Sequence, residues 1–425
     1  MSTFLPSFRR RRPTIVNPRQ AAKIPLEIEF LIIDYFEGDT IHLHSFRLVS
    51  PDWASYAGFL LFRSVCVRDS NVKRFLAVLQ TRNNLGRHII TLIVQEARWP
   101  RDENRPSILD TLGPALSDKM GNLQALELSN RYFSRDGVQL ATGWASISRL
   151  RVRFSGFATA KDMMSFFAAF PRLNSLDVSQ CTSCDIPMQP LQCAIPVPAW
   201  HLNYLALAQC PQSTLVDWLV ADPGEITVDH LRIVSFEADA SPFNALLKKI
   251  GRGLRHLEVP PQCRVILGAE VPLSIHDCTA LTTVNFFERG DLDHGPDIVS
   301  LLPQVRSPNL TTVSFEIYLT TAHLNDIRRW EQVNDVLAMD AFANLEKILV
   351  NMWGAPFASD MAVMSFDEGT SIMKSRLALL EARGLLQFTS PDVVPQITAV
   401  EYQSPHKPSM RNRISRKLAG WMRRR

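Results

Sequence analysis

The chain has 425 residues, of which 46% are hydrophobic and 21% charged, and its formal net charge is +4. This composition excludes a collagen, a coiled coil and a chain without a folded core, and no apolar run reaches the roughly 18 residues that a membrane-spanning helix needs. Seven cysteines, an odd number, accompany an N-terminus without the apolar core of a signal peptide. Reduced thiols and a cytoplasmic or nuclear location are therefore expected.

Charge is unevenly distributed along the chain. Residues 1–23 hold six cations and residues 402–425 hold eight, neither segment holds an acid, and the remaining residues 24–401 carry a net charge of −10. We expect a basic disordered arm over residues 1–23 and a proline-containing linker with a basic tail over residues 391–425. Only these ends have the electrostatics that attract phosphates or anionic lipid, so binding to a specific nucleic acid is not expected.

Residues 24–61 predict a small helical module. A first helix would begin at Pro25, a residue that suits the first turn, and carry apolar residues at helical spacing: Ile28, Leu31, Ile32 and Tyr35. Leu43 and Phe46 would lie on a second short helix. A third would begin near Pro51 and point Trp53 toward the shared core. Three short helices in about forty residues leave little core of their own.

This segment resembles an F-box, a family whose pattern has a Leu-Pro, a Glu, paired aliphatic residues, then Leu-x-x-Val-Cys/Ser and a Trp. The matching positions are Pro25, Glu27, Ile28, Ile32, Phe46, Val49, Ser50 and Trp53. Two positions depart from the family pattern, since Ile24 stands where Leu is usual and Pro51 where a basic residue is common. The resemblance implies docking on the small adaptor subunit of an SCF-type cullin–RING ubiquitin ligase.

The same resemblance implies five adaptor-facing residues: Pro25, Leu26, Ile28, Ile32 and Val49. The alternative is that they form the core of the bundle, and for Ile32, Val49 and Trp53 we favour that core interpretation. Apolar residues left exposed on so small a bundle would be a partner surface.

Residues 62–390 contain a repeated pattern of an apolar residue, two residues, an apolar residue, one residue and an apolar residue. Ten copies begin at Ile89, Leu123, Ile147, Leu173, Leu202, Leu231, Leu254, Leu281, Leu310 and Leu345. Phe62-Val65-Val67 is a candidate earlier copy. The average interval of about 28 residues lies within the range of leucine-rich repeats, so each copy predicts one short strand.

Helices are predicted between the strands. Thr159 can cap a helix with apolar residues at i, i+3, i+4 and i+7, and Ser241-Pro242 opens another. A strand and a helix cannot each bury an apolar face alone, so the units must stack. The segment resembles the leucine-rich repeat family, in which Asn or Cys follows the third apolar position by three residues; Cys181 and Cys210 match. The fold class implied is α/β: the F-box-like module, then an irregular solenoid with a curved parallel sheet.

One predicted strand alternates arginines with apolar residues, which places three arginines on one face. The candidate target-binding residues on this and neighbouring strands are Arg149, Arg151, Arg153, Asp177 and Tyr204. Arginine recognises carboxylates and phosphates through paired hydrogen bonds, so an acidic or phosphorylated target could dock there. The alternative, which we favour, is a solvated face on which Glu127 and Asp177 neutralise the arginines.

Catalytic and metal sites are not indicated. Cys181-x-x-Cys184 is a single close pair of ligands, whereas tetrahedral zinc typically takes two. No nucleotide-binding or hydrolase motif occurs. We therefore assign no catalytic residue, metal or cofactor, and a hydrolase would require the repeat periodicity to be coincidental.

The combined pattern predicts a substrate-recognition subunit of an SCF-type ligase, with the adaptor subunit, the cullin complex and an unknown protein substrate as partners. The alternative is a repeat scaffold outside any ligase, nuclear or membrane-associated through its basic ends. A membrane contact would involve only the tail, where Ile414, Leu418, Trp421 and Met422 allow a basic amphipathic helix. A disordered tail without either role is the further alternative.

Overall fold

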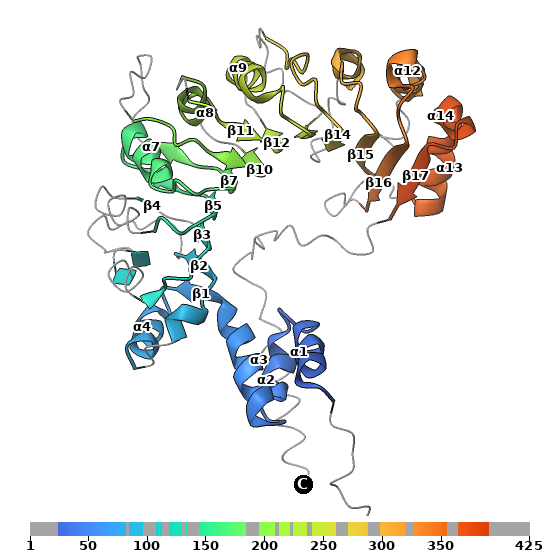
Figure 1. The fold of residues 1–425 in the computed structure, drawn as a ribbon. Coiled ribbons are helices and arrows are strands. Elements are labelled where there is room, and N and C mark those ends of the chain that lie inside the picture. The colour runs from blue at the N-terminus through green and yellow to red at the C-terminus, as the bar shows by residue number, and fades with distance from the viewer. Residues whose placement is uncertain are drawn as a thin grey trace, which may run out of the picture. The chain divides into compact units, whose positions relative to one another are not determined.

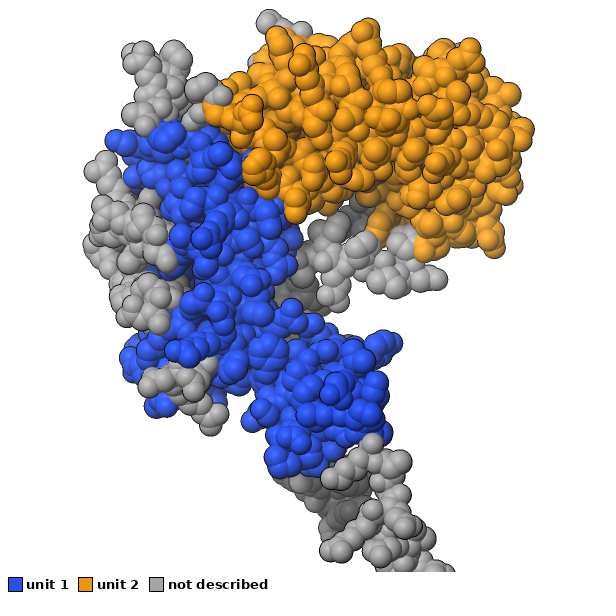
Figure 2. Space-filling model, in the orientation of Figure 1, with its two compact units in different colours: residues 1–200 blue, residues 201–425 orange. Residues whose placement is uncertain are grey.

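The computed structural model describes fifteen segments of the chain: residues 24–81, 85–96, 108–109, 111–112, 119–129, 132–133, 144–183, 195–208, 212–221, 224–235, 240–260, 271–287, 298–319, 327–354 and 364–390. The predicted basic arm of residues 1–23 and the tail of residues 391–425 lie outside them. The chain divides into two compact units, residues 1–200 and residues 201–425 (Figure 2).

The first unit begins with a helical module of α1 (Leu26–Asp34), α2 (Thr40–Phe46) and α3 (Pro51–Arg63). Its core consists of Ile33, Leu43, Ala57 and Leu60, with aromatic side chains packed around them. The hydroxyl of Ser50 accepts the Trp53 N–H at 3.2 Å and so caps α3. Pro51 occupies the first turn of that helix, where no backbone donor is needed.

The rest of the first unit alternates strands with helical segments. The strands are β1 (Ser64–Arg68), β2 (Thr91–Gln95), β3 (Ala125–Ser129), β4 (Tyr132–Phe133), β5 (Arg149–Arg153), β6 (Gly156–Phe157), β7 (Ser175–Ser179) and β8 (Thr182–Ser183). The helices are α4 (Val72–Thr81), the 3-10 helix η2 (Leu85–His88) and α7 (Ala160–Ala168). Helix α7 begins as predicted, because the Thr159 hydroxyl accepts the N–H of Asp162 at 3.0 Å.

The second unit continues the alternation. Its strands are β9 (His201–Leu202), β10 (Tyr204–Ala208), β11 (Thr227–Val228), β12 (His230–Ser235), β13 (His256–Val259), β14 (Thr283–Phe287), β15 (Thr312–Tyr318), β16 (Lys347–Trp353) and β17 (Leu386–Thr389). Its helices are α8 (Gln212–Ala221), α9 (Ser241–Ile250), α10 (Ile298–Leu301), η4 (Leu302–Gln304), α12 (Ile327–Leu337), η5 (Asp340–Phe342), α13 (Phe366–Arg376) and α14 (Ala378–Ala382).

Twelve strands among the described residues form one sheet, in the order β1-β2-β3-β5-β7-β10-β12-β13-β14-β15-β16-β17. The pairings within each unit are parallel. Short strands make two smaller sheets, β4-β6-β8 in the first unit and β9-β11 in the second. In the second unit, α8, α9 and α12 all lie on the same side of the strands (Figure 1). The prediction of an α/β repeat protein built on a long parallel sheet is confirmed.

One predicted strand position is wrong by three residues. The sequence pattern places the sixth copy at Leu231-Val234-Phe236, but Leu231 pairs with Leu205 on one side and with Leu257 on the other. The repeat is therefore Val228-Leu231-Ile233, and all three of these side chains are buried. Its first residue lies 26 positions after Leu202 and 26 before Leu254, so the corrected interval is more even than the predicted one.

The two ends of the repeat region also differ from the prediction. The expected boundary lies between residues 61 and 62, but α3 continues through Arg63 and β1 begins at Ser64. Val65 and Val67 nevertheless pair in register with Leu92 and Val94, as the candidate earlier copy requires. At the other end, β17 is a further strand that the pattern does not predict.

Candidate functional site

The helical module carries a cluster of exposed apolar side chains. Twelve large apolar side chains are exposed among the described residues, and nine of them belong to this module. We call these nine the apolar surface: Ile24, Leu26, Ile28, Leu31, Ile32, Tyr35, Ile41, Leu48 and Val49. Scattered exposed apolar residues are ordinary on a protein, whereas a concentration on one small module is typical of a partner surface.

Helix α1 is apolar on two opposite faces. Toward α3 it buries Ile33 completely, and the ring of Phe30 stacks on Tyr56 with centroids 4.1 Å apart. The other face carries four apolar side chains at i, i+3, i+4 and i+7 that are 39% to 87% exposed: Ile28, Leu31, Ile32 and Tyr35. One face of the helix therefore completes the core of the module, and the other is left to solvent.

All five residues predicted to face the adaptor are exposed: Pro25, Leu26, Ile28, Ile32 and Val49. The core interpretation of Ile32 and Val49 is wrong. Val49 is 60% exposed, and Ile32 is 39% exposed because the next residue, Ile33, occupies the core position on α1. Trp53 is half-buried and packs against the core, as expected. Contact between the five residues and an adaptor stays a prediction.

Side-chain contacts fix the three helices against one another. The indole N–H of Trp53 donates to Glu29 Oε2 at 2.6 Å, and the Tyr56 hydroxyl donates to Asp34 Oδ1 at 2.9 Å. The Asp39 carboxylate caps α2 by accepting the N–H groups of Ile41 and His42, each at 3.1 Å. These hydrogen bonds, foremost those with His42, hold the pKa of Asp39 below its ordinary value. The module is thus ordered by polar contacts around a small core.

The module joins the first strand of the sheet without a linker. Arg63 ends α3 and Ser64 begins β1, and the Arg63 carbonyl accepts the N–H of Ile90 at 2.9 Å. The Phe59 ring packs edge-on against His88 with centroids 5.5 Å apart. Helix α3 therefore contacts both β1 and the segment that leads into β2.

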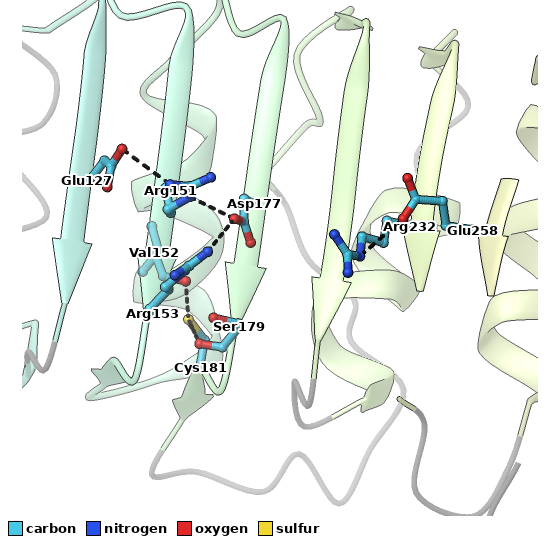
Figure 3. Close-up of polar contacts among 9 residues, drawn as sticks. All are labelled: Glu127, Arg151, Val152, Arg153, Asp177, Ser179, Cys181, Arg232 and Glu258. Atoms are coloured by element: carbon cyan, nitrogen blue, oxygen red, sulfur yellow. Dashed lines mark hydrogen bonds and ion pairs between the residues drawn. The ribbon is translucent and has the colours of Figure 1, made fainter. Parts of the chain in front are cut away.

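On strand β5, the structure confirms the alternative that we favoured for Arg151 and Arg153. Arg151 Nε lies 2.7 Å from Asp177 Oδ2 and Arg151 Nη1 lies 3.3 Å from Glu127 Oε1. Arg153 Nη2 shares the same Asp177 oxygen at 3.2 Å (Figure 3). The two carboxylates on the neighbouring strands thus neutralise these arginines. Arg149 is exposed and makes no ion pair with any residue that the structure describes.

Cys181 takes the inward position that the repeat family implies. It is 1% exposed, and its Sγ lies 3.6 Å from both the Val152 and the Ser179 carbonyl oxygens (Figure 3). The thiol therefore satisfies backbone acceptors at the end of a repeat. Its predicted counterpart Cys210, and Cys184 of the close cysteine pair, lie outside the described residues.

Strands β10, β12 and β13 hold a second polar network on the strand face. His230 Nε2 lies 2.7 Å from Glu258 Oε1. Arg232 Nε lies 3.3 Å from Glu258 Oε2, a contact that Figure 3 shows. The rings of Tyr204, His230 and His256 follow one another, with centroids 5.0 Å and 5.7 Å apart. Tyr204, a predicted target-binding residue, therefore belongs to this network rather than to the arginine strand.

The protonation of this network is biased by its surroundings. Partial burial lowers the pKa of His256, whose side chain stays accessible to solvent, and the positive charges of His230 and Arg255 lower it further. Burial works to raise the pKa of Glu258, but the hydrogen bond from His230 and the charge of Arg232 hold it below its ordinary value. The sequence pattern missed His230 and Arg232, because its copy began at Leu231 rather than at Val228.

No group of three His, Cys, Asp or Glu side chains that could hold a metal occurs in the part of the chain that the structure describes. Within the same residues, no helix combines the length and the apolar character needed to cross a membrane.

Comparison with known proteins does not assign the chain to a family. No protein-family model matches the chain, and no curated protein matches it. Among solved structures, a chain of the crystal structure of the Rad7 and Elc1 complex in yeast is 12% identical, with a TM-score of 0.32 over 80% of this chain and 90% of that one. A likeness this weak carries no argument on function. The chain is an α/β repeat protein in which a three-helix module is followed, along the sequence, by a long parallel sheet.

Proposed function

We propose that this protein is the substrate-recognition subunit of an SCF-type cullin–RING ubiquitin ligase. The α1–α3 module would dock on the adaptor subunit, which connects it to the cullin complex, and the repeat units would bind the target protein. The proposal starts from the resemblance of residues 24–61 to an F-box. The observation that carries it is the apolar surface: of the twelve large apolar side chains that are exposed among the described residues, nine lie on that module. No chemistry of its own is assigned to the chain.

Exposure of the apolar surface has a free-energy cost that a partner would remove. Burial of apolar surface contributes roughly 25 cal/mol per Å², and the buried core of the module consists of only four residues with which to offset exposed apolar area. The stripe on α1 is continuous over two turns, so it suits a partner with an apolar groove or helix face. An adaptor that covers this stripe would bind the module without changing its core.

The structure adds residues to the expected contact set. Leu31 and Tyr35 share the exposed face of α1 with Ile28 and Ile32, and both are more exposed than those two. Leu48, which is 88% exposed, precedes Val49 in the turn between α2 and α3. We expect the exposed face of α1 and this turn to contribute most of the adaptor affinity, since burial of apolar surface is the main favourable term in most protein association.

Binding to the purified adaptor subunit tests the proposal. Full-length protein should retain the adaptor in a pull-down, and the Ile28→Ala/Leu31→Ala/Leu48→Ala variant, which truncates exposed residues of α1 and of the turn after α2, should lose most of that retention. A matched control is Met339→Ala/Leu379→Ala, which removes two exposed apolar side chains outside the module and should bind like the wild type. Circular dichroism should show that both variants fold.

Two results would contradict the proposal. If wild-type protein does not retain the adaptor, the ligase function fails and the repeat scaffold outside a ligase becomes the better description. If the control variant loses as much binding as the triple variant, the retention does not depend on the apolar surface.

A further inference from the structure

The first unit presents an ordered grid of side chains on its strand face, the side of β1, β2, β3, β5 and β7 opposite the buried residues. Strand pairing places these side chains in three rows. The rows are Ser64, Thr91, Ala125, Arg149 and Ser175; then Cys66, Ile93, Glu127, Arg151 and Asp177; then Arg68, Gln95, Ser129, Arg153 and Ser179.

This grid carries more cations than anions. The grid contains four arginines and two carboxylates. Both carboxylates, those of Glu127 and Asp177, lie in the middle row and contact Arg151. Asp177 also forms an ion pair with Arg153, and Arg68 Nε donates to the neutral Gln95 Oε1 at 3.0 Å. The grid therefore has a net charge of +2, although residues 24–401 together carry −10.

Arg149 is the cation with the fewest local partners. Its neighbours in the row are Ala125 and Ser175, which carry no charge. The carboxylates one row away are already engaged by Arg151 and Arg153. An exposed guanidinium without a local carboxylate can bind one from another molecule at little cost in broken contacts.

We propose that this strand face docks a carboxylate-rich segment of the target protein, with Arg149 as its principal contact. The inference rests on the proposed function and names the class of target. Arg153 is not offered as a second contact, because Asp177 already pairs with it at 3.2 Å.

Fluorescence anisotropy with full-length protein and fluorescein-labelled hexaglutamate tests this docking. Hexaglutamate should bind at about 50 mM salt and weaken strongly at about 500 mM, since exposed ion pairs are screened. Arg149→Glu should weaken binding about tenfold, because it replaces an attraction with a repulsion. The control is Lys161→Glu, which makes the same charge change at an exposed position of α7 and should alter affinity less than about twofold.

The other outcomes overturn the docking site. Equal losses of hexaglutamate affinity in Arg149→Glu and Lys161→Glu would show that the peptide is attracted by net charge alone. If the wild-type protein does not bind hexaglutamate, the proposed docking site is wrong. Binding of a phosphoserine peptide without binding of hexaglutamate would contradict the carboxylate class. Adaptor retention by Arg149→Glu should equal that of the wild type, which separates failure of this site from failure of the proposed ligase function.

Discussion

The indole N–H of Trp53, in α3, and the Glu29 carboxylate, in α1, are joined across the helical module by a 2.6 Å hydrogen bond. Because one partner is charged and the site is partly buried, its removal should destabilise the module by about 1–2 kcal/mol. Glu29→Ala should therefore speed backbone hydrogen exchange in α1, measured by mass spectrometry. Glu27→Ala, at an exposed position of the same helix, should leave exchange unchanged; equal acceleration would contradict the role of the bond.

The corrected position of the sixth repeat predicts losses of stability of different size for two adjacent residues. Ile233 is fully buried, so Ile233→Ala should cost about 2–5 kcal/mol of unfolding free energy. Val234 lies at an irregularity in the register between β10 and β12 and is only half-buried, so Val234→Ala should cost less than about 1 kcal/mol. Urea denaturation of both variants measures the difference, and a larger loss for Val234→Ala would restore the position predicted from sequence.

Stability of the second unit should fall in mild acid because of His256. Its pKa in the folded protein lies below the ordinary value of 6.5, so the unfolded chain binds the proton more readily. The stabilisation is fully present above about pH 6.5 and is lost as the pH falls below it. The groups that face His256 are His230, Arg255, Asp229 and Glu258.

His256→Gln should remove this part of the pH dependence, measured as the urea midpoint between about pH 7.5 and about pH 5.5. His201→Gln, at an exposed position in the same unit, is the matched control. A wild-type midpoint that does not fall with pH, or a fall that persists in His256→Gln, would contradict the prediction.

Cysteine reactivity should differ among the three described thiols. Burial raises the pKa of Cys278 to about 12, and the nearby Asp277 acts in the same direction. Cys181 is also buried, whereas Cys66 is only half-buried. Because the thiolate is the reactive form, iodoacetamide should label Cys66 before Cys181 and Cys278 in native protein, as read by peptide mass spectrometry. Faster labelling of Cys278 would contradict the packing around it.

Much of the fold could be predicted from sequence because a parallel sheet repeats one spacing of apolar residues. Nine of the ten predicted copies coincide with strands of the large sheet. The sixth failed because Val228-Leu231-Ile233 and Leu231-Val234-Phe236 both satisfy the pattern, and only pairing with Leu205 and Leu257 distinguishes them. Strand β17 was missed because Arg383 stands where its first apolar residue would be.

The candidate surfaces were harder to predict than the strands. Helical spacing identifies Ile28, Leu31, Ile32 and Tyr35 as one face, but it cannot tell whether the chain itself or another molecule covers that face. Phe30 and Ile33 decide the question, because they supply the contact with α3 and leave the other face exposed. On β5, the spacing of the sequence predicts that three arginines lie on one side of the strand. It does not predict that Arg151 and Arg153 both pair with Asp177, because that depends on side-chain distances.

The direct junction between Arg63 and Ser64 makes the register of α3 part of the geometry of the sheet. Each residue inserted into an α-helix rotates the preceding part of the helix by about 100° relative to the following part and shifts it by about 1.5 Å along the axis. A single insertion before Arg63 would therefore redirect the apolar surface relative to β1, while the Arg63 carbonyl still met Ile90. Length changes among homologous chains should accordingly be excluded from this junction and accommodated in the loops that follow the strands.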